Sequence, residues 1–276
     1  MKKNRILKIG YSIVFYLLMH ACVYPGKNNN SVKVVRYKFG GIFSKTYFPY
    51  SKTTDSIVES YHENPNVISE RIEYKDGKRN GWSENFNTLG KLLYKSFYVN
   101  DLENGIAYSF YETGNLETIL YYVSGKQIGP VKYFFENGEL QAFNFKDMNG
   151  KNSYVIVYDS LSRSILKEEG IVLCNFNLMR SIDSNGKVYQ NVAKLNQRVQ
   201  IQFSPVQLPK KITKVSMGEV GQDEMKPLKL NNFIATFETV FKTEGIHHLV
   251  IEGKILEPNG NVYLSQTLNK DIFVTK

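Results

Sequence analysis

Bulky and small or polar side chains alternate with a two-residue period along most of the chain. Residues 106–111 are one example, because Ile106, Tyr108 and Phe110 alternate with smaller or more polar neighbours. Successive side chains of a β-strand point to opposite faces, so this alternation predicts strands. Turn-forming segments such as 112–115 and 124–126 separate the strands. The sequence therefore predicts an all-β fold.

The alternation recurs with a fixed period of 24 residues. Three segments that begin at residues 81, 105 and 129 align without gaps as GWSENFNTLGKL, GIAYSFYETGNL and GPVKYFFENGEL. A fixed period predicts equivalent units that stack, here hairpins that form an antiparallel meander whose Phe and Leu columns bury one face. Glycine provides the positive φ that their turns need. The repeated Gly, Phe, Gly and Leu are Gly81, Phe86, Gly90, Leu92, Gly105, Phe110, Gly114, Leu116, Gly129, Phe134, Gly138 and Leu140.

A further aromatic column consists of Phe97, Tyr121 and Phe145. With these positions, residues 57–169 resemble the MORN-repeat variant of bacterial proteins, a family often labelled as a toxin-antitoxin component. The resemblance implies an interaction scaffold, and we place the repeat region at residues 55–169. The family pattern corresponds to Phe110-Tyr111, Gly114, Leu116, Tyr121-Tyr122, Gly125-Lys126 and Gly129.

From residue 170 onward the period disappears, although the alternation continues. Turn signals stand at residues 184–186 and 258–261. Seven short strands predict a β-sandwich over residues 170–276, and residues 243–263 look like the late hairpin of an immunoglobulin-like module. The predicted strands are residues 171–176, 199–203, 212–217, 233–241, 246–255, 262–264 and 272–275.

The N-terminus has the features of an export signal. Residues 1–21 begin with basic side chains, continue with an apolar run from Ile9 to Met19 and end at Ala21. The apolar run is shorter than the roughly 20 residues of a membrane-spanning helix, so a permanent span is the weaker alternative. Cys22 resembles the lipobox cysteine at which bacterial lipoproteins are cleaved and diacylated. We therefore predict a lipid anchor on Cys22, followed by a tether and leading strands over residues 22–54, and a location at a membrane of the cell envelope on its periplasmic or outer-membrane face.

The formal net charge of +9 does not indicate a nucleic-acid partner. Four basic side chains lie within the first eight residues, and those between residues 27 and 52 precede the first acidic residue of the mature chain, Asp55. A solvated basic stretch explains this excess, and contact with anionic lipid beside an anchor is the alternative. We predict a membrane and a protein as partners.

Sequence motifs for catalysis, cofactors and metals are absent. The chain has no G-x-S-x-G, phosphate-loop, H-E-x-x-H or C-x-x-C motif. His247 and His248 are strand neighbours that face opposite sides, so one is expected inside and one outside, and together they cannot chelate one ion. Cys174 is expected to be a small buried hydrophobe. We predict a protein that is not an enzyme and that holds no cofactor or metal.

Aromatic side chains of the repeat sheet are the candidates for binding, namely Trp82, Tyr111, Tyr133 and Phe135. The alternative is that they pack only on flanking strands. The sequence favours a lipid-anchored scaffold protein that binds a protein partner through the repeat sheet. An antitoxin-like or immunity-like protein is a second hypothesis, and a glycan-binding or glycan-cleaving protein is a third, which requires a pocket that joins carboxylates and tyrosines.

Overall fold

The computed structural model describes residues 20–25, 31–36, 42–48, 55–64, 66–173, 178–190, 192–221, 225–231 and 233–276. These residues form 24 β-strands, and the described residues contain no helix. The predicted all-β fold is confirmed. Contacts divide the chain into two compact units, which are described separately below: unit 1 comprises residues 1–104 and 109–114, and unit 2 comprises residues 105–108 and 115–276.

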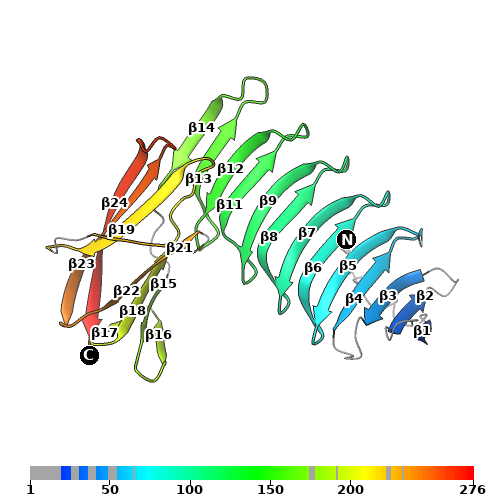
Figure 1. The fold of residues 1–276 in the computed structure, drawn as a ribbon, viewed down its shortest axis with the longest axis horizontal. Helices are drawn as coiled ribbons and strands as arrows, with labels where there is room; N and C mark the ends of the chain where they lie inside the picture. Colours follow the sequence, from blue (N-terminus) through cyan, green and yellow to red (C-terminus); the bar gives the residue numbers. More distant parts are fainter. Residues whose placement is uncertain are drawn as a thin grey trace, which may run out of the picture. The chain divides into compact units, whose positions relative to one another are not determined.

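The first fourteen strands form one sheet in which the strands follow their order along the chain (Figure 1). The short strand β10 pairs with β9 beside this path. The pairs within each unit are antiparallel, so the predicted antiparallel meander is confirmed. The strands are β1 (His20–Pro25), β2 (Ser31–Arg36), β3 (Ile42–Phe48), β4 (Ser56–Tyr61), β5 (Ile68–Lys75), β6 (Lys78–Phe86), β7 (Leu92–Val99), β8 (Leu102–Phe110), β9 (Leu116–Val123), β10 (Lys126–Gln127), β11 (Gly129–Phe134), β12 (Leu140–Lys146), β13 (Asn152–Tyr158) and β14 (Ile165–Gly170).

The repeat turns have one common geometry. In each turn the tenth-place glycine has positive φ, and its N–H donates to the carbonyl oxygen three residues earlier. Positive φ is costly for residues with a Cβ, which explains why glycine returns at this place. The three bonds are Gly90 to Asn87 at 2.9 Å, Gly114 to Tyr111 at 2.8 Å and Gly138 to Phe135 at 2.8 Å.

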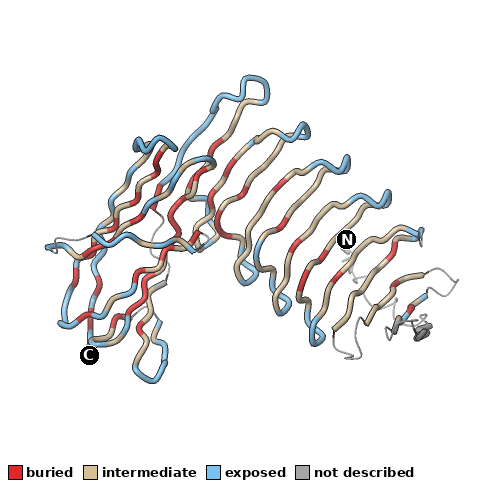
Figure 2. The backbone as a smooth tube through the Cα atoms, in the orientation of Figure 1, coloured by how far each residue is buried: buried red, intermediate tan, exposed pale blue. Residues whose placement is uncertain are grey.

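The sheet of unit 1 is one layer thick in its described part. Most side chains of β4 to β7 are half-buried on both faces of the sheet (Figure 2). The main cluster of buried residues contains members only from Ile128 onward, all of them in unit 2. In the described part of unit 1, contacts between neighbouring strands, and not a covered core, therefore stabilise the sheet.

The most buried column of the repeat consists of small residues at its third place. Ser83 is 6% exposed, and Ala107 and Val131 are completely buried. The repeated Phe and Leu side chains lie beside the hairpin turns instead and are half-buried. Small residues suit the third place because their larger neighbours on the same face cover them.

Two five-stranded sheets form the C-terminal sandwich in unit 2. The first has the order β16-β15-β18-β22-β21, and the second has the order β17-β24-β23-β19-β20, in which β17 and β24 are parallel. Apart from the additional edge strand β16, this order corresponds to the A-B-E-D and A′-G-F-C-C′ sheets of immunoglobulin-type sandwiches, so the predicted sandwich is confirmed. The strands are β15 (Leu178–Ile182), β16 (Val188–Gln190), β17 (Ala193–Lys194), β18 (Arg198–Phe203), β19 (Ile212–Glu219), β20 (Lys226–Pro227), β21 (Leu230–Asn231), β22 (Ile234–Val240), β23 (Gly245–Leu256) and β24 (Val262–Thr275).

The sequence-based strand predictions need three corrections. The predicted strands 262–264 and 272–275 are parts of one strand, β24, because polar side chains on an exposed strand conceal its alternation. Strands β15, β16, β17, β20 and β21 were not predicted. The predicted strand 171–176 is wrong in its described part, where residues 171–173 contain only an isolated bridge from Leu173 to Pro205. Cys174 lies outside the described residues, so its expected burial stays a prediction.

One hydrophobic core joins the last repeats to the sandwich within unit 2. Phe143 and Phe145 of β12 belong to the same buried cluster as Val199 and Ile201 of β18. The ring of Phe233 lies edge-on to the rings of Tyr121, at 5.9 Å between centroids, and Phe145, at 6.4 Å. The aromatic column of the repeat therefore also packs against the sandwich.

The export signal falls almost entirely outside the described residues. Residues 1–19 are not described, and β1 contains the predicted cleavage position before Cys22, whose side chain is not described either. In the described part of the chain no helix is both long and apolar enough to span a bilayer. Cleavage and lipidation stay predictions.

Candidate functional site

A row of alternating charges crosses unit 1. The row contains five side chains that face one another directly from β3 to β7: Lys45, Glu59, Arg71, Glu84 and Lys95. Residues that are directly opposite in antiparallel strands share a face of the sheet. All five therefore lie on one face, and we call this row the charge ladder.

Hydrogen bonds fix the first half of the charge ladder. The Glu59 carboxylate accepts from the Tyr47 hydroxyl at 2.9 Å and from the Tyr61 hydroxyl at 2.8 Å, both at Oε2. Burial and the hydrogen bond to Glu59 raise the pKa of Tyr61 far above its ordinary value. The ammonium group of Lys45 lies 4.9 Å from the centre of the Tyr61 ring. Among the described atoms the buried Nε of Arg71 has no hydrogen-bond partner, which leaves one donor of this guanidinium unused.

The second half of the charge ladder adjoins an aromatic pair. Lys95 Nζ lies 2.7 Å from Glu84 Oε1 and 4.5 Å from the centre of the Trp82 ring. The Trp82 ring meets Phe97 edge-on at 5.3 Å between centroids. A cation over an indole is a favourable pairing, so Lys95 is held between a carboxylate and an aromatic ring.

The four aromatic candidates from the sequence do not share one surface. All of them, Trp82, Tyr111, Tyr133 and Phe135, are half-buried. Trp82 occupies the second place of the repeat and Tyr133 the fifth, and places three apart face opposite sides of a strand. Tyr111 and Phe135 lie at hairpin turns, where their carbonyls accept from the turn glycines. Only Trp82 adjoins the charge ladder.

The place of Lys95 in the repeat is apolar in unit 2, whereas the place of Glu84 keeps a charge there, since Lys132 stands two repeats after Glu84 and directly opposite Phe143. Phe143 stands two repeats after Lys95, and its side chain is 1% exposed in the core shared with the sandwich. Phe145, two repeats after Phe97, is also completely buried there. The same face of the repeat thus packs against a β-domain in unit 2 and carries charges in unit 1.

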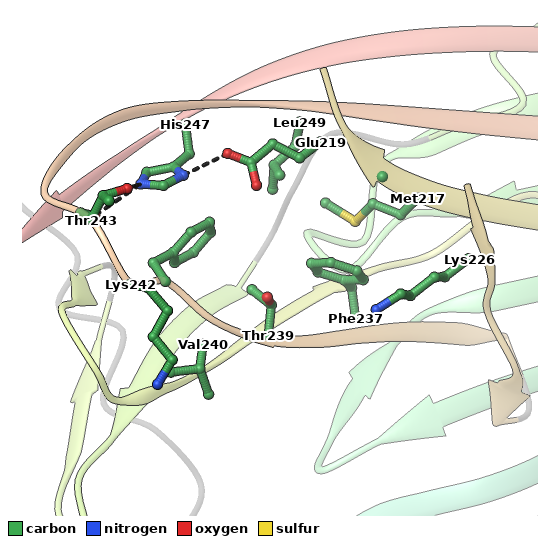
Figure 3. Close-up of a pocket in the computed structure, with 12 residues that line it drawn as sticks. Met217, Glu219, Lys226, Phe237, Thr239, Val240, Lys242, Thr243, His247 and Leu249 are labelled. Carbon is green, nitrogen blue, oxygen red and sulfur yellow. Dashed lines mark hydrogen bonds and ion pairs between the residues drawn. The ribbon is translucent and has the colours of Figure 1, made fainter. Parts of the chain in front are cut away.

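A cavity of about 300 Å³ opens between the two sheets of the sandwich (Figure 3). Its polar wall contains His247, which is 9% exposed, while His248 is exposed, as predicted for neighbours in a strand. His247 Nδ1 lies 2.6 Å from Glu219 Oε1, and Nε2 lies 2.9 Å from the Thr243 carbonyl oxygen. Both partners are acceptors, so this geometry suits the protonated imidazolium, in which each ring nitrogen donates. The sequence analysis missed Glu219, although Val215, Met217 and Glu219 alternate and place the carboxylate on the inner face of β19.

Thr243, His247 and Glu219 are arranged like the hydroxyl, imidazole and carboxylate that activate a nucleophile in some enzymes. His247 Nδ1 contacts Glu219, and Thr243 Oγ1 lies 3.3 Å from His247 Nε2. A general base needs a free lone pair on that nitrogen. The nearer Thr243 carbonyl oxygen takes the Nε2 proton, so His247 in this geometry cannot accept one from the Thr243 hydroxyl. The three residues hold the connection between β22 and β23 to the end of β19.

A third feature is a groove of about 550 Å³ that joins a carboxylate to two tyrosines. Glu168 of β14 accepts from the Tyr154 hydroxyl at 2.7 Å and from the Tyr263 hydroxyl at 2.8 Å, both at Oε1. Burial, followed by the hydrogen bond to Glu168, raises the pKa of Tyr263 to about 12. The glycan hypothesis requires a pocket of this kind, in which carboxylates and tyrosines meet. Among the described residues no group of three His, Cys, Asp or Glu side chains is placed to hold a metal ion.

No protein-family model matches the sequence, and none of the curated proteins is significantly similar to it. Among solved structures, the chain is similar to the extracellular domain of a one-component system of B. thetaiotaomicron at 9% identity and a TM-score of 0.20, covering 92% of this chain and 43% of that one. A polysaccharide lyase is similar at 11% identity and a TM-score of 0.20, covering 94% of this chain and 39% of that one. The chain spans less than half the length of either protein, and likeness at this level establishes no shared activity.

Proposed function

We propose that this chain is a lipid-anchored protein of the cell envelope that binds a protein partner on the charge-ladder face of unit 1. One observation supports the proposal above all. The same face of the repeat packs against a β-domain in unit 2, through Phe143 and Phe145. The repeat scaffold is thus suited to docking on this face, and in unit 1 no described residue of that unit covers it.

The chemistry of the charge-ladder face suits a protein partner. Arg71, Trp82 and Tyr47 are of the residue types that dominate the energetics of protein interfaces. Fixed, alternating charges reward a partner with the complementary pattern and penalise others, so they provide specificity more than affinity. Only a surface that already has its rings and charges held in place avoids the entropy cost of ordering them.

The anchor part of the proposal rests on the sequence of the first 22 residues. A basic start, an apolar run and Cys22 after Ala21 are the features that support lipidation. A diacylated N-terminus would hold the protein at a membrane without a spanning helix. The proposal thus has two parts, a lipid anchor and a scaffold role without catalysis.

A glycan-binding role is the second candidate, and the groove at Glu168 favours it. Tyrosine rings and a carboxylate can stack on and hydrogen-bond a sugar ring. Affinity electrophoresis in gels with neutral and acidic polysaccharides tests this role. Retardation that Glu168→Gln abolishes would support it, and equal mobility in all gels would remove it.

In the antitoxin-like or immunity-like hypothesis the protein forms the same kind of complex, and its partner is a toxin. We test the scaffold hypothesis and the antitoxin-like hypothesis together by cross-linking the full chain in its native host, purifying it and identifying the captured proteins by mass spectrometry. Lys45→Gln with Lys95→Gln removes the two terminal charges of the ladder. Lys214→Gln with Lys254→Gln, which removes two charges from the outer face of the sandwich, is the matched control.

We expect one partner to be recovered with the wild type and the control, and several-fold less with the ladder variant. A toxin among the captured proteins would support the antitoxin-like form of the proposal. Equal recovery from all three proteins would show that the charge-ladder face does not bind the partner.

A further inference from the structure

The outer edge of β14, the last strand of the long sheet, is open (Figure 1). Among the described residues only β13 pairs with this strand. The N–H of Ile171 donates to the carbonyl oxygen of Ser153, so the backbone groups of Glu168 and Gly170 point away from β13. Every residue of β14 is exposed. The edge therefore offers N–H and C=O groups to a further strand.

A second open strand edge borders the groove of about 550 Å³. Strand β24 pairs with β23 on one side, and on its other side the described residues pair only at Val274 and Thr275, with β17. Apart from Tyr154, the groove is lined by two runs of consecutive residues, 168–172 and 263–266. Consecutive residues of a strand point to opposite faces, so a groove lined by such runs follows the strand edges. It lies between two open edges of unit 2.

Strands β14 and β24 run in the same direction along the groove. The Tyr263 hydroxyl donates to Glu168, and further along both segments the N–H of Leu173 donates to the side chain of Gln266. The residue numbers thus increase together on the two sides. The two strands belong to different sheets and do not pair with each other. A strand between them that is antiparallel to both would continue the antiparallel pairing of the long sheet.

The charges beside the groove leave one carboxylate without a cation. Lys167 Nζ lies 2.7 Å from Glu169 Oε1, so these two charges match each other. Lys211, whose ammonium group lies over the Tyr263 ring, is paired with Glu257. Glu168 accepts from tyrosine hydroxyls and has no cationic partner among the described residues. Its charge therefore remains to be matched.

Residues outside the described part do not supply the missing cation. Residues 174–177, which follow the groove lining in the sequence, contain no charged side chain. The other undescribed residues of unit 2 are 191, 222–224 and 232, and their only charged side chains are acidic. A basic side chain opposite Glu168 is thus favoured in an added strand. The exposed Ile165, Leu166 and Ile171 favour apolar neighbours around it.

We propose that the groove receives an extended peptide segment of a protein partner, which adds to β14 as an antiparallel strand and places a basic residue, flanked by apolar residues, opposite Glu168. The site is separate from the charge-ladder face, so its test does not depend on the function proposed for that face. Two open backbone edges favour a peptide over a glycan as the occupant of this groove.

Isotope-labelled glycine provides a local readout in the purified full chain. The amide of Gly170 lies on the open edge, while Gly90 and Gly186 lie in hairpin turns and are the internal controls. We add the acetylated and amidated peptide TVTRTVT and follow the shift and hydrogen exchange of the glycine amides by NMR. The peptide TVTETVT reverses the central charge. The peptide TPTRTPT keeps the arginine but cannot form a strand ladder, because proline lacks the N–H.

We expect TVTRTVT to shift the Gly170 amide in a saturable manner and to slow its exchange, because this N–H then donates to the peptide backbone. Gly90 and Gly186 should not change. TVTETVT should bind at least about tenfold more weakly, since Glu168 repels its carboxylate. Equal binding of TVTRTVT and TVTETVT would overturn the basic residue, and slower Gly170 exchange with TPTRTPT would overturn strand addition.

Two variants with the same change of charge test the role of Glu168. Glu168→Gln should weaken the binding of TVTRTVT at least about tenfold. Glu169→Gln, the matched control, removes a charge that Lys167 already pairs with and should bind like the wild type. Both side chains are exposed, so the variants should fold. Equal affinity of the two variants would contradict recognition by Glu168.

Glycan probes distinguish the competing occupant of the groove. Cellohexaose and an oligogalacturonate are added to the same labelled protein, and both should leave the Gly170 amide unchanged. A change at Gly170 with either glycan and none with TVTRTVT would assign the groove to a glycan and overturn the proposal. A Gly170 amide that responds to no probe would refute strand addition as well.

Discussion

The ring of Phe233 lies directly against Gly129. A Cβ added to Gly129 would stand 2.7 Å from the ring, closer than any such contact in a relaxed structure. Gly129 is the first-place glycine of the third repeat, and Phe233 belongs to the sandwich. The glycine of the repeat is therefore also the place at which the sandwich ring enters the shared core.

Gly129→Ala should be more destabilising than Gly105→Ala. Both glycines have positive φ, +81° and +107°, so both substitutions carry a backbone penalty of about 1 kcal/mol. A Cβ at Gly105 would meet nothing within 4 Å, whereas one at Gly129 must displace Phe233. We expect an additional cost of about 1 to 3 kcal/mol for Gly129→Ala, measured by urea unfolding. Equal losses in the free energy of unfolding for the two variants would show that Phe233 can move aside without destabilising the core.

The charge ladder should make the stability of unit 1 sensitive to salt. Arg71→Glu places like charges opposite both Glu59 and Glu84, and we expect a loss of about 1 to 2 kcal/mol in the free energy of unfolding. About 1 M salt should restore part of this loss by screening. Arg71→Gln, the neutral control, should cost less and respond less to salt. Identical unfolding curves for the two variants at low salt would contradict the ladder.

The His247–Glu219 pair should make stability depend on pH. Burial lowers the pKa of His247, but the bonds to the Thr243 carbonyl and to Glu219 outweigh burial and raise it above its ordinary value. A raised pKa stabilises the protonated fold, so this contribution is complete below about pH 6.5 and is lost as the pH rises through the pKa of the folded state. Urea unfolding of the wild type should therefore show declining stability across that interval.

His247→Gln removes the titrating group, and this decline should disappear with it. His248→Gln is the matched control, since it leaves His247 and its partners in place and should keep the wild-type decline. The interpretation is wrong if the His247→Gln protein keeps the wild-type decline.

The sequence predicted the hairpins well because glycine specifies their turns locally. The charge ladder could not be predicted, since it depends on which residues stand opposite each other. A bulge between Ile72 and Tyr74 shifts the register of β5 and β6 in a way that no local signal specifies. The aromatic candidates lie on different faces of the sheet for a related reason. Trp82 and Tyr133 are both aromatic, but the face on which each side chain lies follows from its place in the repeat.

Lipidation of Cys22 is a prediction of its own. Cells that are given a radioactive fatty acid should label the wild-type protein, because a diacylated cysteine carries the label covalently. Cys22→Ser should be unlabelled and should be recovered in the soluble fraction. An unlabelled wild-type protein that fractionates like Cys22→Ser would defeat the anchor.

Site-specific photo-cross-linking tests the binding face most directly. A benzophenone amino acid at Lys95 would stand at the end of the charge ladder, beside Trp82. The same residue at Lys254, on the outer face of the sandwich, is the control. In cells of the native host the account predicts one discrete protein adduct from position 95 and none from position 254. An adduct from position 254 with none from position 95 would contradict it.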